Sequence, residues 1–306
     1  MDAFISVILE VAVTLLLIVI GYFTVKKGMF TKESLGSITS FLLYIVTPCL
    51  LVSSFLSAEP GKLDGWTMLL AAVLPALSIV ISIAVSYLFF RREPLGRRRV
   101  LRFSTVFCNV GFMGIPLVEG IVGSEGVLYG SFFIAVFNIF CWTYGYVMMG
   151  GGKVRLKALL LNPGVIGLVI GLPLYLLDVP VPALFVEPVE LISALNTPLA
   201  MIVVGGYIAQ VKLRAFVSDL AVYKMAVLRL VVAPLLYLAL VWLLRPDETL
   251  LMSTVIQAAT PVAANCVLFA VQYDSDAELA SKSVAVSTAL SVVTIPLLTV
   301  LVQALL

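Results

Sequence analysis

Ten apolar stretches, each about twenty residues long, constrain the fold of this chain more than any other feature of its sequence. A helix needs about 20 apolar residues to cross the hydrocarbon core of a membrane. The stretches are apolar on every face, whereas transmembrane strands alternate apolar and polar residues. They fall at residues 3–25, 35–56, 66–90, 100–121, 126–149, 159–177, 189–211, 222–244, 249–270 and 280–304. The sequence therefore predicts an all-α integral membrane protein with ten transmembrane helices.

The composition supports this class and excludes several others. Of the 306 residues, 62% are hydrophobic and 12% are charged, whereas a soluble domain is nearer half apolar and a quarter charged. This excludes a cytosolic enzyme, a nucleic-acid-binding protein and a small disulfide-stapled secreted domain. The chain has no histidine, which is the commonest metal ligand, and its four cysteines lie in apolar stretches without CxxC spacing. We therefore expect no cofactor, no metal site and no nucleic-acid partner.

Lysine and arginine are distributed unevenly between the connections. Sixteen of the nineteen lysine and arginine residues lie in the connections between expected helices 1 and 2, 3 and 4, 5 and 6, 7 and 8, and 9 and 10. The opposite connections hold only Lys62 and Arg245. Since basic residues are retained on the cytoplasmic side, we expect a protein of the cell (inner or plasma) membrane with both termini outside. Arg229 lies inside the expected helix 222–244 and is predicted to extend its guanidinium to the cytoplasmic surface.

A weak internal repeat pairs the two halves of the chain. Matches at an offset of about 150 residues pair expected helix 1 with 6, helix 2 with 7 and helix 4 with 9. The matched segments are Val19-Ile20-Gly21 with Val169-Ile170-Gly171, Thr47-Pro48 with Thr197-Pro198, and Ser104-Thr105-Val106 with Ser253-Thr254-Val255. We therefore expect two repeats, residues 1–153 and 154–306. Because five helices is an odd number, the second repeat enters the membrane inverted, which is typical of transporters. The alternative is chance similarity between apolar helices.

Two of the expected helices contain residues that disfavour a continuous helix. The fourth contains NVGFMGIP at residues 109–116, and the ninth contains QAATPVAAN at residues 257–265. Glycine and proline disfavour the helix interior, and unwound backbone in a membrane is tolerated only where protein buries it or where it lines a cavity. Interruptions at corresponding positions of two repeats indicate a binding site, and the helix N-termini there favour an anion. The alternative is a pair of proline kinks that serve packing alone.

Polar residues near these interruptions are the candidates for substrate binding, because polar side chains inside a membrane are costly and are commonly functional. The candidates are Thr47, Asn109, Gly111, Gly114, Pro116, Asn138, Asn196, Gln257, Pro261 and Asn265, with Thr197 beside Asn196. Hydrogen bonding between helices is the alternative role for each polar one. Glu119 and Glu10 are candidates for carrying a coupling proton if they are buried, because burial raises the pKa of a carboxyl group. The alternative role for both is contact with the lipid headgroups at the outer surface of the membrane.

Six segments carry a resemblance to a known family. They read IGYFTVKKGMF (20–30), YIVTPCLL (44–51), NVGFMGIPL (109–117), LNPGVIGLVIGLPL (161–174), LNTPLAMIVVGGYIA (195–209) and the stretch from ATPVAAN to STALSVVTIPLL (259–298). In this order they span nearly the whole chain. The chain resembles the auxin efflux carrier family of membrane transporters, whose bacterial branch includes proteins described as malonate or malate carriers.

The resemblance implies a fold similar to that of sodium/proton antiporters and bile-acid symporters, in which broken helices 4 and 9 cross at mid-membrane. It further implies a moving core of helices 3–5 and 8–10, and a scaffold of helices 1, 2, 6 and 7 that often forms a homodimer. The family pattern also places substrate contacts on asparagines of the fourth and fifth helices, which match Asn109 and Asn138 here.

These observations lead to the hypothesis of a secondary transporter. It carries a small mono- or dicarboxylate, auxin-like or malate/malonate-like, by elevator-type alternating access. No GxxxxGK[ST] motif is present, so a gradient or the membrane potential drives transport. Helix 9 has Gln257 and Asn265 but no acidic residue, which favours proton coupling through Glu119 or Glu10, or uniport, over a sodium-coupled symporter of the bile-acid type. The sequence also allows an anion-binding membrane sensor or scaffold without transport, or a channel, and it disfavours an intramembrane enzyme.

Overall fold

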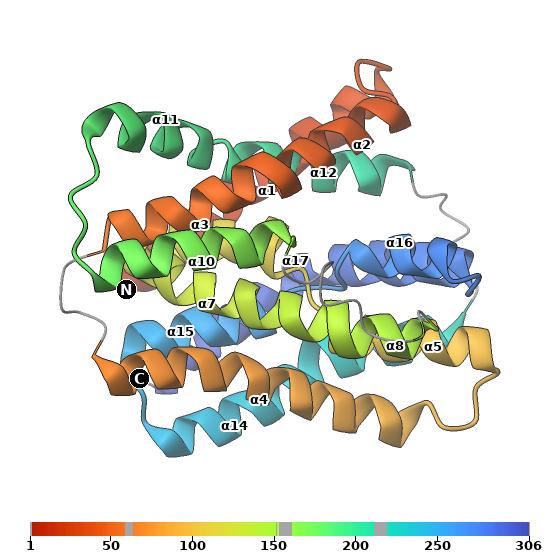
Figure 1. Ribbon diagram of the computed structural model, residues 1–306. Helices are drawn as coiled ribbons and strands as arrows, with labels where there is room; N and C mark the ends of the chain where they lie inside the picture. The colour runs from red at the N-terminus through yellow and green to blue at the C-terminus, as the bar shows by residue number, and fades with distance from the viewer. Residues whose placement is uncertain (1, 59–63, 151, 153–160, 211–218, 306) are drawn as a thin grey trace.

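The computed structural model describes residues 2–58, 64–150, 152, 161–210 and 219–305, and this part of the chain is helical with no strand (Figure 1). The elongated helices lie lengthwise in one bundle, and α1 begins at the same end of the bundle at which α17 ends. In chain order the helices are α1 (Asp2–Lys26), α2 (Lys32–Phe41), α3 (Thr47–Leu56), α4 (Gly65–Phe89), α5 (Leu95–Val106), α6 (Ile115–Val122), α7 (Ser124–Phe140), α8 (Tyr146–Met149), α10 (Pro163–Leu176), α11 (Ala183–Ser193), α12 (Asn196–Gln210), α13 (Leu220–Val227), α14 (Ala233–Leu244), α15 (Glu248–Ala258), α16 (Asn265–Gln272) and α17 (Ala277–Leu305).

Within the described residues, six helical stretches are long and apolar enough to cross a membrane, and three further apolar helices are shorter. The six are Glu33–Leu56, Gly65–Phe89, Ser124–Met149, Ala183–Gln210, Leu220–Leu244 and Ala277–Leu305, and the shorter ones are Leu15–Lys26, Val110–Val122 and Pro163–Leu176. The architecture is thus that of an all-helical, multi-pass membrane protein. The expected fourth and ninth spans are each divided into two short helices, so neither reaches spanning length as one element.

Local capping and a proline explain two of the differences between the expected and the observed helices. The expected helix 159–177 begins at Pro163, because the side chain of Asn162 accepts hydrogen bonds from the backbone N–H groups of Gly164 and Val165 and so caps the N-terminus; residues 159 and 160 lie outside the described part. The expected helix 189–211 is two helices, α11 and α12. Pro198 lies in the first turn of α12, where its missing N–H leaves no helical bond unmade.

Three prolines follow π-helical segments at the same spacing. The segments η1 (Leu42–Val46), η2 (Val110–Gly114) and η5 (Leu228–Val232) each end two residues before a proline, which are Pro48, Pro116 and Pro234. A proline has no N–H to donate to the preceding turn, and a π turn widens the helix by one residue where the bonding pattern changes. Pro116 therefore lies inside a helix rather than at the interruption, which corrects the expectation that it breaks the fourth span.

Helices α1 and α12 approach closely at two glycines. A Cβ atom added to Gly21 would lie 2.7 Å from the carbonyl carbon of Ile202, and one added to Gly205 would lie 2.7 Å from that of Ile18. Both neighbours are backbone atoms, which cannot move without displacing a helix. Small residues at such positions allow the backbones of membrane helices to come into contact.

Gly205→Ala is therefore expected to destabilise the protein by about 1–3 kcal/mol and to lower the midpoint of thermal unfolding in detergent by several degrees. Gly36→Ala in α2 is the matched control, because no atom lies within 4 Å of the added Cβ and alanine is the better helix former. An unchanged midpoint for Gly205→Ala would show that the two helices do not meet at this glycine.

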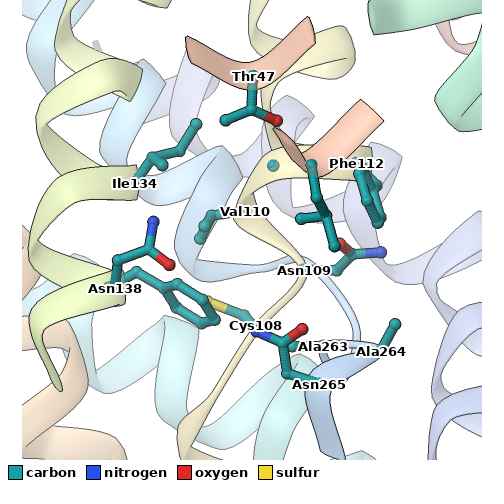
Figure 2. Close-up of a pocket in the computed structure, with 13 residues that line it drawn as sticks. Thr47, Cys108, Asn109, Val110, Phe112, Ile134, Asn138, Ala263, Ala264 and Asn265 are labelled. Atoms are coloured by element: carbon teal, nitrogen blue, oxygen red, sulfur yellow. The ribbon is translucent and has the colours of Figure 1, made fainter. Parts of the chain in front are cut away.

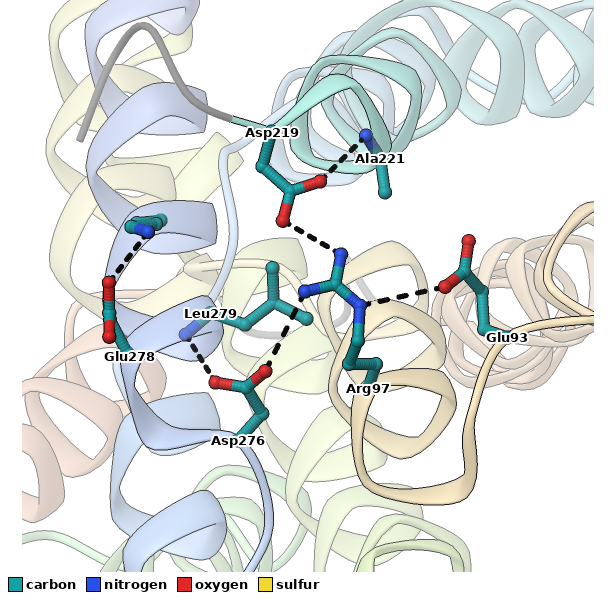
Figure 3. Close-up of polar contacts among 8 residues, drawn as sticks. Glu93, Arg97, Asp219, Ala221, Asp276, Glu278 and Leu279 are labelled. Atoms are coloured by element: carbon teal, nitrogen blue, oxygen red, sulfur yellow. Dashed lines mark hydrogen bonds and ion pairs between the residues drawn. The ribbon is translucent and has the colours of Figure 1, made fainter. Parts of the chain in front are cut away.

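An ionic cluster connects three helices at the end of the bundle that the charge distribution predicts to be cytoplasmic (Figure 3). Arg97 of α5 contacts Asp219 at 2.7 Å, Glu93 at 3.6 Å and Asp276 at 3.8 Å. Asp219 also accepts a hydrogen bond from the backbone N–H of Ala221 at the start of α13, and Asp276 accepts one from Leu279 at the start of α17. One guanidinium thus links the beginnings of α5, α13 and α17.

Arg97→Gln is expected to lower the unfolding midpoint by a few degrees at low salt, since partly exposed ion pairs contribute up to about 1 kcal/mol each. The difference from wild type should disappear in about 1 M salt, which screens such pairs. Arg98→Gln is the control, because the guanidinium of Arg98 donates to the backbone carbonyl of Arg91 and takes no part in the cluster. A deficit that salt does not alter would argue against an electrostatic role.

A cavity between two interrupted helices

Two unwound segments, residues 107–109 and 259–264, lie side by side in the middle of the bundle. Cys108 and Val262 form an isolated antiparallel bridge. The backbone N–H of Asn109 donates to the carbonyl of Pro261 at 2.8 Å, and that of Ala263 donates to the carbonyl of Phe107 at 3.0 Å. Each segment thereby satisfies backbone groups that the other helix interruption leaves free, as buried backbone requires in an apolar environment. The interruption expected around Pro261 is confirmed, and that of the fourth span lies just before the expected glycines.

Asn109 is the residue at which the chain re-enters a helix. Its φ of −83° and ψ of 61° are those of an inverse γ-turn, and the N–H of Val110 donates to the carbonyl of Cys108 at 3.0 Å. The carbonyl of Asn109 then accepts bonds from Met113 and Gly114, at 3.2 and 3.0 Å. The side chain of Asn109 consequently projects from the N-terminus of the continuous helical stretch η2–α6.

A cavity of about 60 Å³ lies where the helical stretches η2–α6 and α16 begin (Figure 2). Both stretches present their N-termini to it, and a helix N-terminus has unpaired N–H groups and a partial positive charge of about half a unit. Its lining contains no charged side chain and consists of Leu43, Thr47, Cys108, Asn109, Val110, Gly111, Phe112, Ile134, Phe137, Asn138, Ala263, Ala264 and Asn265. The cavity is therefore apolar, with a few amide and hydroxyl groups and a positive backbone potential.

The polar lining side chains come from four different elements. Asn138 belongs to α7, Asn265 begins α16 and Thr47 begins α3, and in Figure 2 they surround the cavity together with Asn109. The hydroxyl of Thr47 donates to the carbonyl of Leu42 at 2.9 Å, so its oxygen faces the cavity chiefly as an acceptor. The three amides each carry two N–H donors, which suit an anionic or carbonyl oxygen.

The structure brings together half of the residues that the sequence nominated for substrate binding. Thr47, Asn109, Gly111, Asn138 and Asn265 line the cavity, whereas Gly114, Pro116, Asn196, Gln257 and Pro261 do not. Pro261 contributes its carbonyl to the bond from Asn109. Asn196 is buried at the start of α12, and its amide nitrogen has no partner among the described residues.

Gln257 lies behind the cavity, packed against glycines. A Cβ atom on Gly114 would lie 3.2 Å from its Cγ, and Gly130 faces its amide nitrogen so closely that a side chain there would overlap it. Gln257 is fully buried, and neither end of its amide has a partner within the described part of the chain. Gly114 therefore serves the close approach of η2 to α15 rather than the cavity.

The two carboxylates considered for coupling are placed differently. Glu119 is exposed, and its carboxylate accepts a hydrogen bond of 2.8 Å from the hydroxyl of Thr197. The burial on which a coupling role depends is therefore absent, and its position favours the alternative of an exposed contact. Glu10 lies within α1, and its side chain is outside the described part of the structure.

The side chain of Arg229 does not lie where the sequence predicts. Its side chain is 1% exposed, so the prediction that it extends to the cytoplasmic surface is wrong. It donates to the carbonyls of Thr105 and Val106 at the end of α5, to that of Ala258 at the end of α15, and to that of Thr260 in the unwound segment that follows. These carbonyls have no helical partner because both helices stop there, and they hold the guanidinium inside the bundle. An arginine in an apolar helix was the signal that could have identified it.

Comparison with known proteins agrees with this architecture. Residues 6–299 match the model of a family described as "Membrane transport protein". An "Uncharacterized transporter" of Methanothermobacter thermautotrophicus is 25% identical over 289 residues, covering 92% of this chain and 94% of that protein. A "Putative malonate transporter" of Rhizobium meliloti is 23% identical over 291 residues, covering 91% and 90%. The family and these relatives are transporters and not enzymes, and the chain belongs to this membrane transport family, the auxin efflux carrier family that its motifs resemble.

Proposed function

We propose that the protein is a secondary transporter that carries a small carboxylate anion through the cavity at the two unwound segments. The observation that carries this proposal is the meeting of two helix N-termini at a cavity that has three amide side chains and no charged one in its lining. Helix N-termini bind carboxylates and phosphates through backbone N–H groups and the helix dipole. The name of the Rhizobium meliloti relative, which mentions malonate, supports the same class of substrate.

The charge at the cavity favours one carboxylate group at a time. Each helix N-terminus contributes about half a positive charge, so the two together balance about one negative charge. The small cavity, of about 60 Å³, suits a carboxylate head better than a whole large acid. A monocarboxylate, or one end of a dicarboxylate such as malonate or malate, therefore fits this site.

Alternating access in this proposal follows the elevator scheme, with ten spans arranged as the inverted repeats 1–153 and 154–306. The scaffold consists of the expected helices 1, 2, 6 and 7, which correspond to α1, α2–α3, α10 and α11–α12. The packing of α1 along α12 and of α3 along α10 supports this grouping. The moving core consists of the expected helices 3–5 and 8–10, and the Arg97 cluster links the beginnings of three of their segments, α5, α13 and α17. The scaffold forms a homodimer in the cell membrane, with both termini outside.

The driving force is a gradient or the membrane potential. Because Glu119 is exposed, uniport or coupling through another group accounts for the site better than proton transfer at Glu119. A sodium-coupled symporter is the alternative, and the fully buried amide of Gln257, whose two ends have no partner among the described residues, is the feature that favours it.

The proposal is tested by thermal unfolding of the purified protein with malonate, malate, lactate and an indole acid, each with and without sodium and at two pH values. A selective rise in the midpoint identifies the substrate class, and a rise that requires sodium favours the symporter. Uptake of the stabilising acid into proteoliposomes then separates a carrier from a sensor, which binds without transport, and saturation of the flux separates it from a channel. No stabilisation by any carboxylate would contradict the proposed substrate class.

A further inference from the structure

We propose that Arg229 gives the two unwound segments their net positive charge and thereby sets the preference of the adjacent cavity for anions, without touching the substrate. The inference rests on the proposed function, because it concerns the charge of the substrate that this cavity binds. Arg229 is in this view a positioning and specificity-determining residue.

The burial of Arg229 requires an explanation in terms of charge. Among the described residues it is the only charged side chain that is buried, and no ion pair within that part of the chain joins it to a carboxylate. Burying an unpaired charge in an apolar environment is costly unless nearby groups compensate it. Three of the four carbonyls that accept hydrogen bonds from Arg229 belong to the last turns of α5 and α15, which are the negative ends of two helix dipoles, and the fourth is that of Thr260 just beyond α15.

The helix dipoles at the unwound segments cancel one another when Arg229 is left out. Two helices, α5 and α15, end there with about half a negative charge each, and two helical stretches, η2–α6 and α16, begin there with about half a positive charge each. Without the arginine, a substrate anion would meet a site whose positive ends are offset by negative ends close behind them. With Arg229, the negative ends are neutralised and the positive ends face the cavity unopposed.

Cys108 connects Arg229 with the cavity. It lines the cavity, forms the bridge with Val262, and lies two residues beyond Val106, whose carbonyl accepts a hydrogen bond from the guanidinium of Arg229. The arginine therefore lies directly behind the cavity lining, where its field reaches the substrate through protein of low dielectric constant. At such short range a unit charge alters anion binding by about tenfold or more.

The test compares Arg229→Gln with Arg229→Lys, two variants that each lose part of the carbonyl bonding and that differ by one charge. The probes are malonate, malonamate and malonamide, which have the same number of heavy atoms and carry two, one and no negative charges. Relative to Arg229→Lys, we expect Arg229→Gln to bind malonate and malonamate about tenfold more weakly, with the affinity for malonamide unchanged.

The inference would be overturned if the two folded variants did not differ in their affinity for malonate or in their affinity for malonamate. A loss of equal size for all three probes would also overturn it, because that result is expected of a merely structural role. Arg229→Lys retains the charge and loses part of the carbonyl bonding. It should keep the wild-type preference for malonamate over malonamide even where its unfolding midpoint falls, and loss of that preference would also contradict the inference.

Arg102→Gln is the control for a general change of charge, because Arg102 of α5 stacks on Tyr87 at 3.8 Å rather than at the unwound segments. It should leave the charge preference unaltered, and an effect as large as that of Arg229→Gln would assign the preference to the overall charge of the protein. Failure of the proposed function looks different, since wild-type protein would then bind neither malonate nor any other carboxylate of the panel.

Discussion

Asn109→Ala is expected to reduce carboxylate uptake into proteoliposomes by roughly a hundredfold, since a hydrogen bond to a charged group contributes about 1.5–3 kcal/mol. Asn109 lines the cavity and begins the helical stretch whose N-terminus faces it. Its backbone, not its side chain, makes the hydrogen bonds to Pro261, Met113 and Gly114. Truncation of the side chain should therefore leave the unfolding midpoint within a few degrees of wild type.

The control for this prediction is Asn196→Ala, which removes an equally polar, buried side chain that lies outside the cavity. It should alter stability without lowering the affinity for the carboxylate. Uptake at the wild-type rate by folded Asn109→Ala protein would exclude the cavity as the substrate site. An equal loss of uptake in both variants would indicate instead that the asparagines act through the fold.

Arg229→Met is expected to destabilise the protein by about 3 kcal/mol or more, because several buried carbonyl groups lose their donor together. Four carbonyls, at or just beyond the two helix ends, accept hydrogen bonds from this one side chain. The unfolding midpoint in detergent should fall by several degrees or more, and the yield of monodisperse protein should fall with it.

Arg229→Lys should recover part of this loss, because an ammonium group keeps the charge but cannot reach four carbonyls with the planar geometry of a guanidinium. Arg102→Gln supplies the comparison for an arginine that is only partly buried. A stability of Arg229→Met equal to that of wild type would show that water or the backbone satisfies the carbonyls without the arginine.

The interruption of the fourth span lies a few residues before the position that its sequence predicts. The glycines and proline of residues 109–116 correctly indicated a broken helix, but the break lies at residues 107–109, before them. A π turn accommodates Pro116, and close packing on Gln257 accounts for Gly114. Glycine and proline indicate that a helix is easily interrupted. The residue at which the interruption occurs depends instead on which neighbouring segment offers hydrogen-bond partners for the backbone.

For the candidate site too, the sequence indicates which kinds of residue take part but not which of them meet. Asn109, Asn138 and Asn265 could be nominated because polar residues in apolar spans are few. The family resemblance pointed to Asn109 and Asn138, but the residues themselves did not distinguish the three from Asn196 or Gln257, which are equally polar and equally intramembrane. The apolar lining from Phe112, Ile134 and Phe137 had no sequence signal, because such residues occur throughout a chain that is 62% hydrophobic.

The sequence by itself determined that the protein is an all-helical membrane protein, that two of its helices are interrupted, and that it belongs to its transporter family, because hydropathy, proline and glycine act locally and the membrane forbids unpaired backbone. Only the tertiary structure decided which polar residues meet, where each helix opens, and that Arg229 points inward to two helix ends instead of outward to the surface. The physical reason is that these outcomes depend on hydrogen bonds between residues more than a hundred positions apart, such as that from Arg229 to Thr105.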